Sequence, residues 1–481
     1  MSHTPLDTVR AKIAERRAVL PARGPRPGGR PPRRREPSAL ARLASAWWDR
    51  LLTSVYQGTL SGQEARYTEH ETQRDYLWNT AGTAVWGFSF PLLTIIATQL
   101  AGAEAAGRFS MAFVTGTLLM IAANYGVRTH QVSDIEEEAS FSSYQVARWL
   151  TGAAALAVGA AYIRLRGYDA AMAATCAGVY VYKVVDGVAD VYEGRLQQAD
   201  KLYLAGISQT LRSAAAVGAF AVALFLLRSV AVASAAMAVA AVASLALVTV
   251  PLALLETEKS RRARLGEVAA ILRECLPLGA ALLLFNLIES MPKFVMEGAL
   301  AYENQLYFNA LFFPAQAILL AIGFLYKPQL VRLASIWANP RRRGRFDLIV
   351  AAVLAMVVAL TLGVGALMGW VGISAMGVVY GLDFERFRML AYLMVAAGGI
   401  TAAIDFIYAI VCVLRRAGDV TRIYLIAFAA SVALPLALVN LLGLTGAVVS
   451  YVAVMALLLV LLLMEYVRIR GRIERERNPF R

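Results

Sequence analysis

Ionisable side chains inside apolar stretches are the residues of this chain that could do chemistry. Lys183, Asp186 and Asp190 are spaced i, i+3 and i+7, so a helix would carry all three on one face. Charged groups are costly in hydrocarbon, and those within membrane spans usually face a water-filled cavity. There, cations can hold phosphate oxygens, while carboxylates balance the cations or bind a coupling ion. The pattern indicates a polar path for a charged solute through a membrane.

Two sets of candidate residues follow from this interpretation. Those expected to line a cavity and to contact an anionic substrate are Arg128, Arg148, Lys183, Arg212, Lys293, Gln305, Asn309 and Lys327. Those expected to couple transport to a proton or a sodium ion are Asp186, Asp190, Glu289 and Asp405. Arg212 is the hardest to explain as a purely structural residue, because an unpaired guanidinium within a span would be costly.

Other candidates have a structural alternative that the sequence leaves open. Arg128 and Arg148 lie within reach of lipid headgroups and would then serve as anchors. Lys183 and Asp186 would form an ion pair that only stabilises the helices. Asp405 would join two helices by a hydrogen bond.

Twelve apolar runs contain or adjoin these residues, and each is long enough to cross a bilayer. The hydrocarbon core is roughly 30 Å thick and needs about 20 apolar residues per helical crossing. A composition of 59% hydrophobic and 17% charged residues excludes an ordinary soluble protein. The expected spans are 79–100, 106–127, 144–162, 168–189, 204–227, 231–255, 268–289, 303–326, 346–370, 389–412, 423–441 and 444–467. The predicted fold is an all-α polytopic membrane protein with twelve transmembrane helices.

Positive charge is distributed unevenly along these runs. The net charge is +14, and most of the 47 Lys and Arg residues lie in the two tails and in alternate loops. Positive residues resist translocation, so both termini are expected in the cytoplasm. The basic tails are expected to contact anionic lipid headgroups rather than nucleic acid. The three Cys and three His residues show no metal-binding spacing, so no metal or other cofactor is expected.

The runs fall into two groups of six, which sets the expected domain organisation. A disordered basic tail at 1–37 precedes an amphipathic interfacial helix and linker at 38–75. Two six-helix bundles are expected at 76–258 and 259–468, and a second basic tail covers 469–481.

The two groups also show a faint internal repeat. A shift of 199 residues carries Phe109 and Phe113 onto Phe308 and Phe312. Internal repeats of this kind are typical of transporters that rock around a central site. The repeat therefore predicts two pseudo-repeated bundles around a central cavity.

Three parts of the chain carry a resemblance to a known family. They are Gly126–Asp134 with Phe141–Arg148, Lys183–Gln198, and Glu289–Phe294 with Gln305–Asn309. They resemble the second to fourth and the seventh and eighth spans of bacterial polysaccharide flippases of the Wzx type. The likeness covers roughly residues 75–468. These flippases belong to a superfamily that also includes MATE drug exporters and lipid II flippases.

The resemblance implies a cavity that passes the sugar and diphosphate of an undecaprenyl-linked oligosaccharide from the inner to the outer leaflet. It also implies a multi-pass protein of the bacterial cytoplasmic membrane that is a transporter and not an enzyme. Its partners would be the lipid-linked oligosaccharide and the polysaccharide polymerase or glycosyltransferases that share this substrate.

Two other functions fit the residues less well. An ion-coupled exporter of cationic drugs would need an acidic, aromatic cavity, whereas the central positions here include several cations. A membrane glycosyltransferase or polysaccharide polymerase would need carboxylate-rich loops. The loop after Trp370, with Asp383 and Glu385, is the best place for such chemistry.

Overall fold

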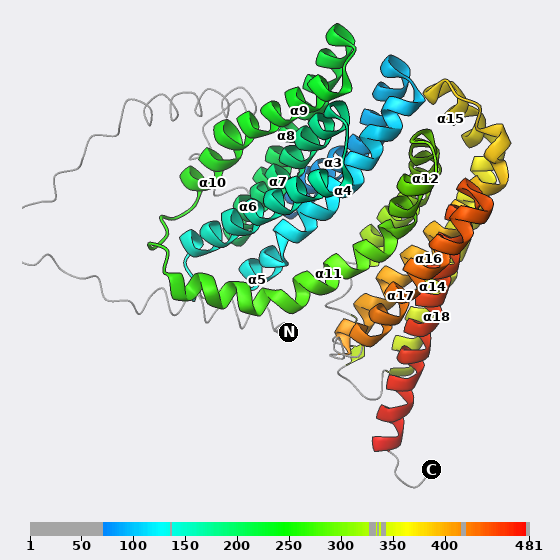
Figure 1. Cartoon of the computed structure of the whole chain (residues 1–481). Coiled ribbons are helices and arrows are strands. Elements are labelled where there is room, and N and C mark those ends of the chain that lie inside the picture. The colour runs from blue at the N-terminus through cyan, green and yellow to red at the C-terminus, as the bar shows by residue number, and fades with distance from the viewer. Residues whose placement is uncertain are drawn as a thin grey trace, which may run out of the picture. The chain divides into compact units, whose positions relative to one another are not determined.

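The computed structural model describes residues 71–134, 137–326, 333, 336–337, 343–414 and 420–477. Every regular element in these ranges is a helix, as Figure 1 shows. The chain divides into a unit Met1–Gln63 and a unit Glu64–Arg481, and all described residues belong to the second. The tail at 1–37, most of the expected interfacial helix and Lys327 therefore lie outside the described residues.

The first half of the described chain forms six long helices and one short one. They are α3 (Glu71–Ala101), α4 (Ala103–Asn124), the short α5 (Val127–Ser133), α6 (Phe141–Arg166), α7 (Ala170–Gln198), α8 (Leu202–Leu227) and α9 (Val230–Ser244), which continues through the π-helical turn η3 (Leu245–Thr249) into α10 (Val250–Glu256).

The second half repeats this plan. Its helices are α11 (Leu265–Ala299), α12 (Glu303–Tyr326), α14 (Arg343–Leu367), which continues through η6 (Met368–Gly372) into α15 (Ile373–Tyr380), the short η7 (Glu385–Phe387), α16 (Arg388–Val413), α17 (Val420–Leu442) and α18 (Leu444–Arg477). The predicted all-α polytopic fold is confirmed.

Eleven helices in the described residues are long and apolar enough to cross a membrane. The twelfth expected span is α7, which is more polar because it carries charged residues along most of its length. α7 packs against α4, α6, α8 and α9, so its charged side chains lie within the protein rather than in lipid. This central position explains how a helix of such composition is tolerated.

The alternation of twelve spans places the start of α3 and the end of α18 on the same side of the helices. We call this the terminal side, and we call the opposite side, where α3 meets α4 and α11 meets α12, the distal side. The terminal side is the side that the charge distribution predicts to be cytoplasmic.

α11 extends well beyond its expected span. The sequence predicts an end at residue 289, but the helix runs on to Ala299 with Pro277 and Pro292 inside it. The polar turn from Glu289 to Lys293 resembles a helix end in the sequence. In the structure it lies within the helix, where a proline is tolerated if neighbouring groups satisfy the freed backbone.

α11 also contacts both halves, as its course between them in Figure 1 suggests. It packs against α4, α5 and α6 of the first half and against α17 and α18 of the second. α12 likewise packs against α4 as well as α16. The two halves therefore meet along α4, α11 and α12.

Candidate functional site

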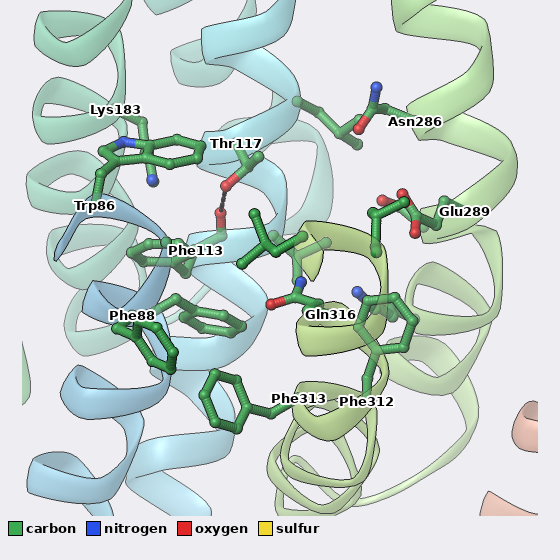
Figure 2. Close-up of a pocket in the computed structure, with 18 of the residues that line it drawn as sticks. Trp86, Phe88, Phe113, Thr117, Lys183, Asn286, Glu289, Phe312, Phe313 and Gln316 are labelled. Carbon is green, nitrogen blue, oxygen red and sulfur yellow. Dashed lines mark hydrogen bonds between the residues drawn. The ribbon is translucent and has the colours of Figure 1, made fainter. Parts of the chain in front are cut away.

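A cavity of about 290 Å³ lies where the two halves meet. Its walls come from α3, α4 and α7 on one side and from α11 and α12 on the other. Figure 2 shows Lys183 and Trp86 across this space from Glu289 and Asn286. The aromatic side chains that line the cavity are Trp86, Phe88, Phe90, Phe113, Phe312 and Phe313.

Lys183 supplies a cation to the cavity from the first half. Its side chain is only 2% exposed, and Nζ lies 4.0 Å from the ring centre of Phe113 and 5.1 Å from that of Trp86. Nζ is also 3.9 Å from Asp186 Oδ2, and Trp86 Nε1 donates to the same oxygen at 3.1 Å. The ammonium is thus stabilised by aromatic faces and by a carboxylate that is shared with other donors.

Arg212 lies behind Asp186 and does not line the cavity. Its Nε donates to Asp186 Oδ1 at 2.8 Å, and an Nη donates to Glu193 Oε1 at 2.7 Å. Arg212 is 1% exposed, and its charge together with that of Lys183 balances the two buried carboxylates. Arg212 therefore positions Asp186, which in turn orients Trp86 and Lys183. Sequence reasoning missed Glu193, although its i+7 spacing from Asp186 could have revealed it.

Arg128 and Arg148 form a second cluster around Asp190, nearer the terminal side. Arg128 donates to Asp190 Oδ1 at 2.7 Å and to Gln197 Oε1 at 3.1 Å. Arg148 is fully buried and donates to Asp190 Oδ2 at 2.9 Å and to the carbonyl of Ala123 at 3.0 Å. None of the three ionic residues lines the central cavity.

Lys293 and Glu289 bring charge to the cavity from α11. Lys293 is 8% exposed, and its Nζ lies 5.4 Å from the ring centre of Phe312 and 5.7 Å from that of Phe308. Glu289, one turn earlier, accepts a hydrogen bond from the Tyr451 hydroxyl at 3.1 Å. Within the described residues, Glu289 is the carboxylate that lines this cavity.

The polar residues at the start of α12 support Lys293. Gln305 Nε2 donates to the carbonyl oxygen of Lys293 at 2.6 Å, and Asn309 Nδ2 donates to the carbonyl oxygen of Gln305 at 2.8 Å. Asn309 and Lys293 also line a smaller cavity of about 30 Å³ that reaches Tyr380. Gln305 thus fixes the α11 backbone, while Asn309 extends the site towards the distal side.

Asp405 lies apart from the cavity. It accepts a hydrogen bond from the Tyr326 hydroxyl at 2.6 Å, which joins α16 to the end of α12. Of the predicted site residues, the structure brings Lys183, Glu289 and Lys293 together around one space. No group of three or more metal-ligating side chains occurs in the described part of the chain.

Contacts on the distal side join the two halves beyond the cavity. Gln99 Nε2 donates to the carbonyl oxygen of Val379 at 2.8 Å, and the hydroxyls of Thr94 and Tyr380 lie 3.4 Å apart. Gly107 abuts the turn before α12, because a Cβ there would overlap the carbonyl oxygen of Tyr302. These contacts hold α3 and α4 against α15 and the α11–α12 turn.

A charged group adds to this distal contact. Glu297 of α11 accepts hydrogen bonds from Tyr162, Arg166 and Tyr168 of the first half.

Nearby, the backbone N–H of Met172 and the Arg108 guanidinium lower the pKa of the exposed Asp169 carboxyl.

On the terminal side, α11 is anchored by the segments that carry the sequence resemblance. His130 of α5 lies 2.8 Å from Glu274 through Nε2 and 2.9 Å from the Tyr144 hydroxyl through Nδ1. Glu267 accepts from the side-chain hydroxyls of Ser140 at 2.9 Å and Ser143 at 2.7 Å. The polar residues of this region therefore attach α11 to the first half.

Comparisons with known proteins find the fold but no sequence family. No family model matches the chain, and none of the curated proteins matches it. One similar solved structure is the inward-facing conformation of a multidrug resistance MATE family transporter of the MOP superfamily. It is 14% identical, the match covers 82% of this chain and 98% of that one, and the TM-score is 0.57.

Two further structures show the same likeness. A MOP superfamily transporter from Pyrococcus furiosus, whose binding pocket is described as of reverse polarity, is 15% identical over 84% of this chain and 96% of its own, with a TM-score of 0.55. The eukaryotic MATE transporter AtDTX14 is 13% identical over 84% of this chain and 98% of its own, with a TM-score of 0.52. The chain therefore has the fold of these transporters.

Proposed function

We propose that this protein is an alternating-access transporter that moves the diphosphate and glycan of an undecaprenyl-linked oligosaccharide from the inner to the outer leaflet. The observation that carries the proposal is the charge of the cavity. Two lysines from opposite halves face it, and one carboxylate accompanies them. Ammonium groups hold phosphate oxygens as point charges, so a diphosphate is a suitable ligand for a pair of them.

The aromatic lining supports a glycan next to the diphosphate. Six aromatic side chains line the same cavity as the lysines and carry flat apolar faces. The site thus combines cations for an anionic group with stacking surfaces for the apolar faces of sugar rings. A polar path is physically required, because stripping the headgroup of water without replacing its contacts would cost several kcal/mol per group.

The lipid tail has a route that avoids the polar cavity. Phe88 lines the cavity and is 50% exposed on the outer surface of α3. Its ring meets the edge of Phe313 of α12 at 5.5 Å, and Gly87 lies beside Leu320. This apolar seam between α3 and α12 would let a prenyl chain remain in the bilayer while the headgroup occupies the cavity.

The position of the contacts suggests a direction of access. The terminal-side contacts attach the first half to α11, whereas the distal contacts also attach it to α15 and to the turn before α12. With both termini cytoplasmic, this arrangement corresponds to a state that is closed towards the outer leaflet. Breaking these contacts would then be the step that releases the glycan.

A second candidate is an ion-coupled exporter of cationic drugs. The likeness to multidrug resistance transporters and the aromatic cavity with Glu289 favour it. The two lysines oppose it, because they would repel a cation in a space with one carboxylate. Enzymatic chemistry at Asp383 and Glu385 has less support, since Glu385 lies in an exposed ion pair with Arg388 on the distal side.

The test is a leaflet-exposure assay in proteoliposomes that contain a fluorescent prenyl diphosphate oligosaccharide. The fraction of label that a membrane-impermeant quencher reaches is followed with time. We expect the wild type to exchange the lipid between leaflets and Lys183→Ala and Lys293→Ala to lose most of this exchange. Lys201→Ala is the matched control, because Lys201 pairs with Glu256 away from the cavity.

Two results would refute the proposal. One is a wild type that exchanges the labelled lipid no faster than empty liposomes. The other is normal exchange by both cavity variants. Uptake or efflux of an organic cation by the same liposomes would instead support the exporter.

A further inference from the structure

Glu289 differs from the other acidic residues near the cavity in what holds it. Asp186 is bound by Arg212, and Asp190 is bound by two arginines. Glu289 instead accepts its hydrogen bond from the neutral phenol of Tyr451. A carboxylate held by a guanidinium stays ionised, whereas one held by a phenol can exchange a proton more readily.

The groups that face Glu289 define its electrostatic surroundings. Lys293 lies one turn along its own helix, and Lys183 faces the same cavity from α7. Tyr451 approaches from α18, and α12 presents the neutral Gln316. The cavity-lining side chains of α3 and α4 are neutral as well. Whether Glu289 is ionised or protonated therefore decides whether the cavity lining carries one or two net positive charges.

We propose that Glu289 is a proton site linked to anion binding, so that the cavity takes up a proton when it takes up an anion. This inference rests on the proposed function, because it assumes an anionic ligand between the two lysines. An anion that enters beside an ionised Glu289 meets a like charge. Protonation removes this repulsion and leaves both lysines free to hold the ligand.

The linkage is reciprocal by thermodynamic necessity. If a proton on Glu289 favours the anion, the anion favours the proton by the same factor. A single like charge within one cavity is expected to change the affinity by about tenfold, within the usual range for coupled sites. A cation exporter would show the opposite sign, because a cation and a proton compete for one carboxylate.

The same site connects ligand binding to the second half of the protein. Tyr451 belongs to α18, and its hydroxyl is the link to Glu289 on α11. A neutral carboxyl is a weaker acceptor than a carboxylate, so protonation loosens this contact. The occupied cavity would then differ from the empty one in how firmly α18 is held to α11.

The experiment measures binding and proton uptake together. The full chain in nanodiscs is titrated with a farnesyl diphosphate sugar, a diester whose two charges are fixed between about pH 5.5 and about pH 8. Calorimetry in two buffers of different ionisation enthalpy counts the protons. We expect the wild type to bind about tenfold more tightly at the lower pH and to take up a proton.

Two variants and one control assign the proton. Glu289→Gln keeps the size of the side chain and should bind with an affinity that no longer depends on pH and without proton uptake. Tyr451→Phe keeps the carboxylate but removes its donor, so the pH at which the affinity changes should rise. Glu385→Gln removes an exposed distal carboxylate and should behave like the wild type.

The outcomes separate this inference from the proposed function. Binding by the wild type without proton uptake, or uptake that persists in Glu289→Gln, overturns the role of Glu289 and leaves the anion site standing. The anion site itself is overturned if the wild type fails to bind the probe. It is also overturned if Lys183→Ala and Lys293→Ala both bind the probe as tightly as the wild type.

Discussion

Lys183 and Lys293 enter one cavity from opposite halves of the protein, each with its ammonium group over a phenylalanine ring. Lys183 Nζ lies 4.0 Å from the ring centre of Phe113, and Lys293 Nζ lies 5.4 Å from that of Phe312. These two rings are the pair that a shift of 199 residues superimposes in the sequence. The internal repeat thus places equivalent aromatic faces beneath two lysines that come from non-equivalent helices.

The first prediction concerns cooperation between these lysines. Lys183→Ala and Lys293→Ala should each weaken binding of a prenyl diphosphate sugar by about 10- to 100-fold, the equivalent of one charged hydrogen bond. If both hold the same diphosphate, the double variant should lose less than the product of the two single losses, and a double-mutant cycle measures the difference. Strictly multiplicative losses would place the two lysines on separate ligands.

The second prediction concerns Arg212, which neutralises Asp186 and Glu193 in the interior. Arg212→Met should lower the free energy of unfolding by about 3–5 kcal/mol, because the buried Glu193 is left without a cation and Asp186 keeps only Lys183, at 3.9 Å. Thermal unfolding of the purified protein reports this as a lower midpoint. The double variant Arg212→Met, Glu193→Gln leaves Asp186 with Lys183 as its counter-ion and should recover part of the loss. An Arg212→Met protein as stable as the wild type would contradict the assignment.

The third prediction concerns the distal contacts. Gln99 and Val379 touch across the two halves, so cysteines at both positions should react with a short bismaleimide cross-linker in a background without the native cysteines. Cross-linking should stop leaflet exchange while leaving probe binding intact, since the cavity lies on the terminal side of this contact. Each single-cysteine variant, treated in the same way, is the control. Unimpaired exchange by the cross-linked protein would show that the distal side need not open.

The sequence predicted the helices well, because apolar runs of membrane length are a strong signal. The expected span at 303–326 coincides with α12. The end of α11 is harder to predict, because Glu289 and Lys293 fit the polar end of a span, and only the packing around them shows that they face a cavity. The same local pattern fits a helix end and a polar stripe inside a helix.

The site could be predicted only in part, since charge in a span does not reveal its partner. Lys183 and Lys293 line the cavity. Arg212 does not, because Glu193 and Asp186 on a neighbouring helix bind its guanidinium. Which ionic groups pair with each other depends on helix rotation and contact across the bundle, which the residue pattern of one helix does not encode.

The aromatic lining was the largest omission. Trp86 and Phe88 lie in an ordinary apolar run and carry no local sign of function. They become site residues only because α3 turns that face towards α12. Such a role is visible in the three-dimensional arrangement and not in the composition of the helix.

The most direct test of the central claim is a structure of the protein with a bound prenyl diphosphate sugar. We expect density for the diphosphate between the Nζ atoms of Lys183 and Lys293, with the first sugar against the aromatic side chains and the prenyl chain passing between α3 and α12. Density for the ligand elsewhere, with both ammonium groups unchanged, would contradict the account.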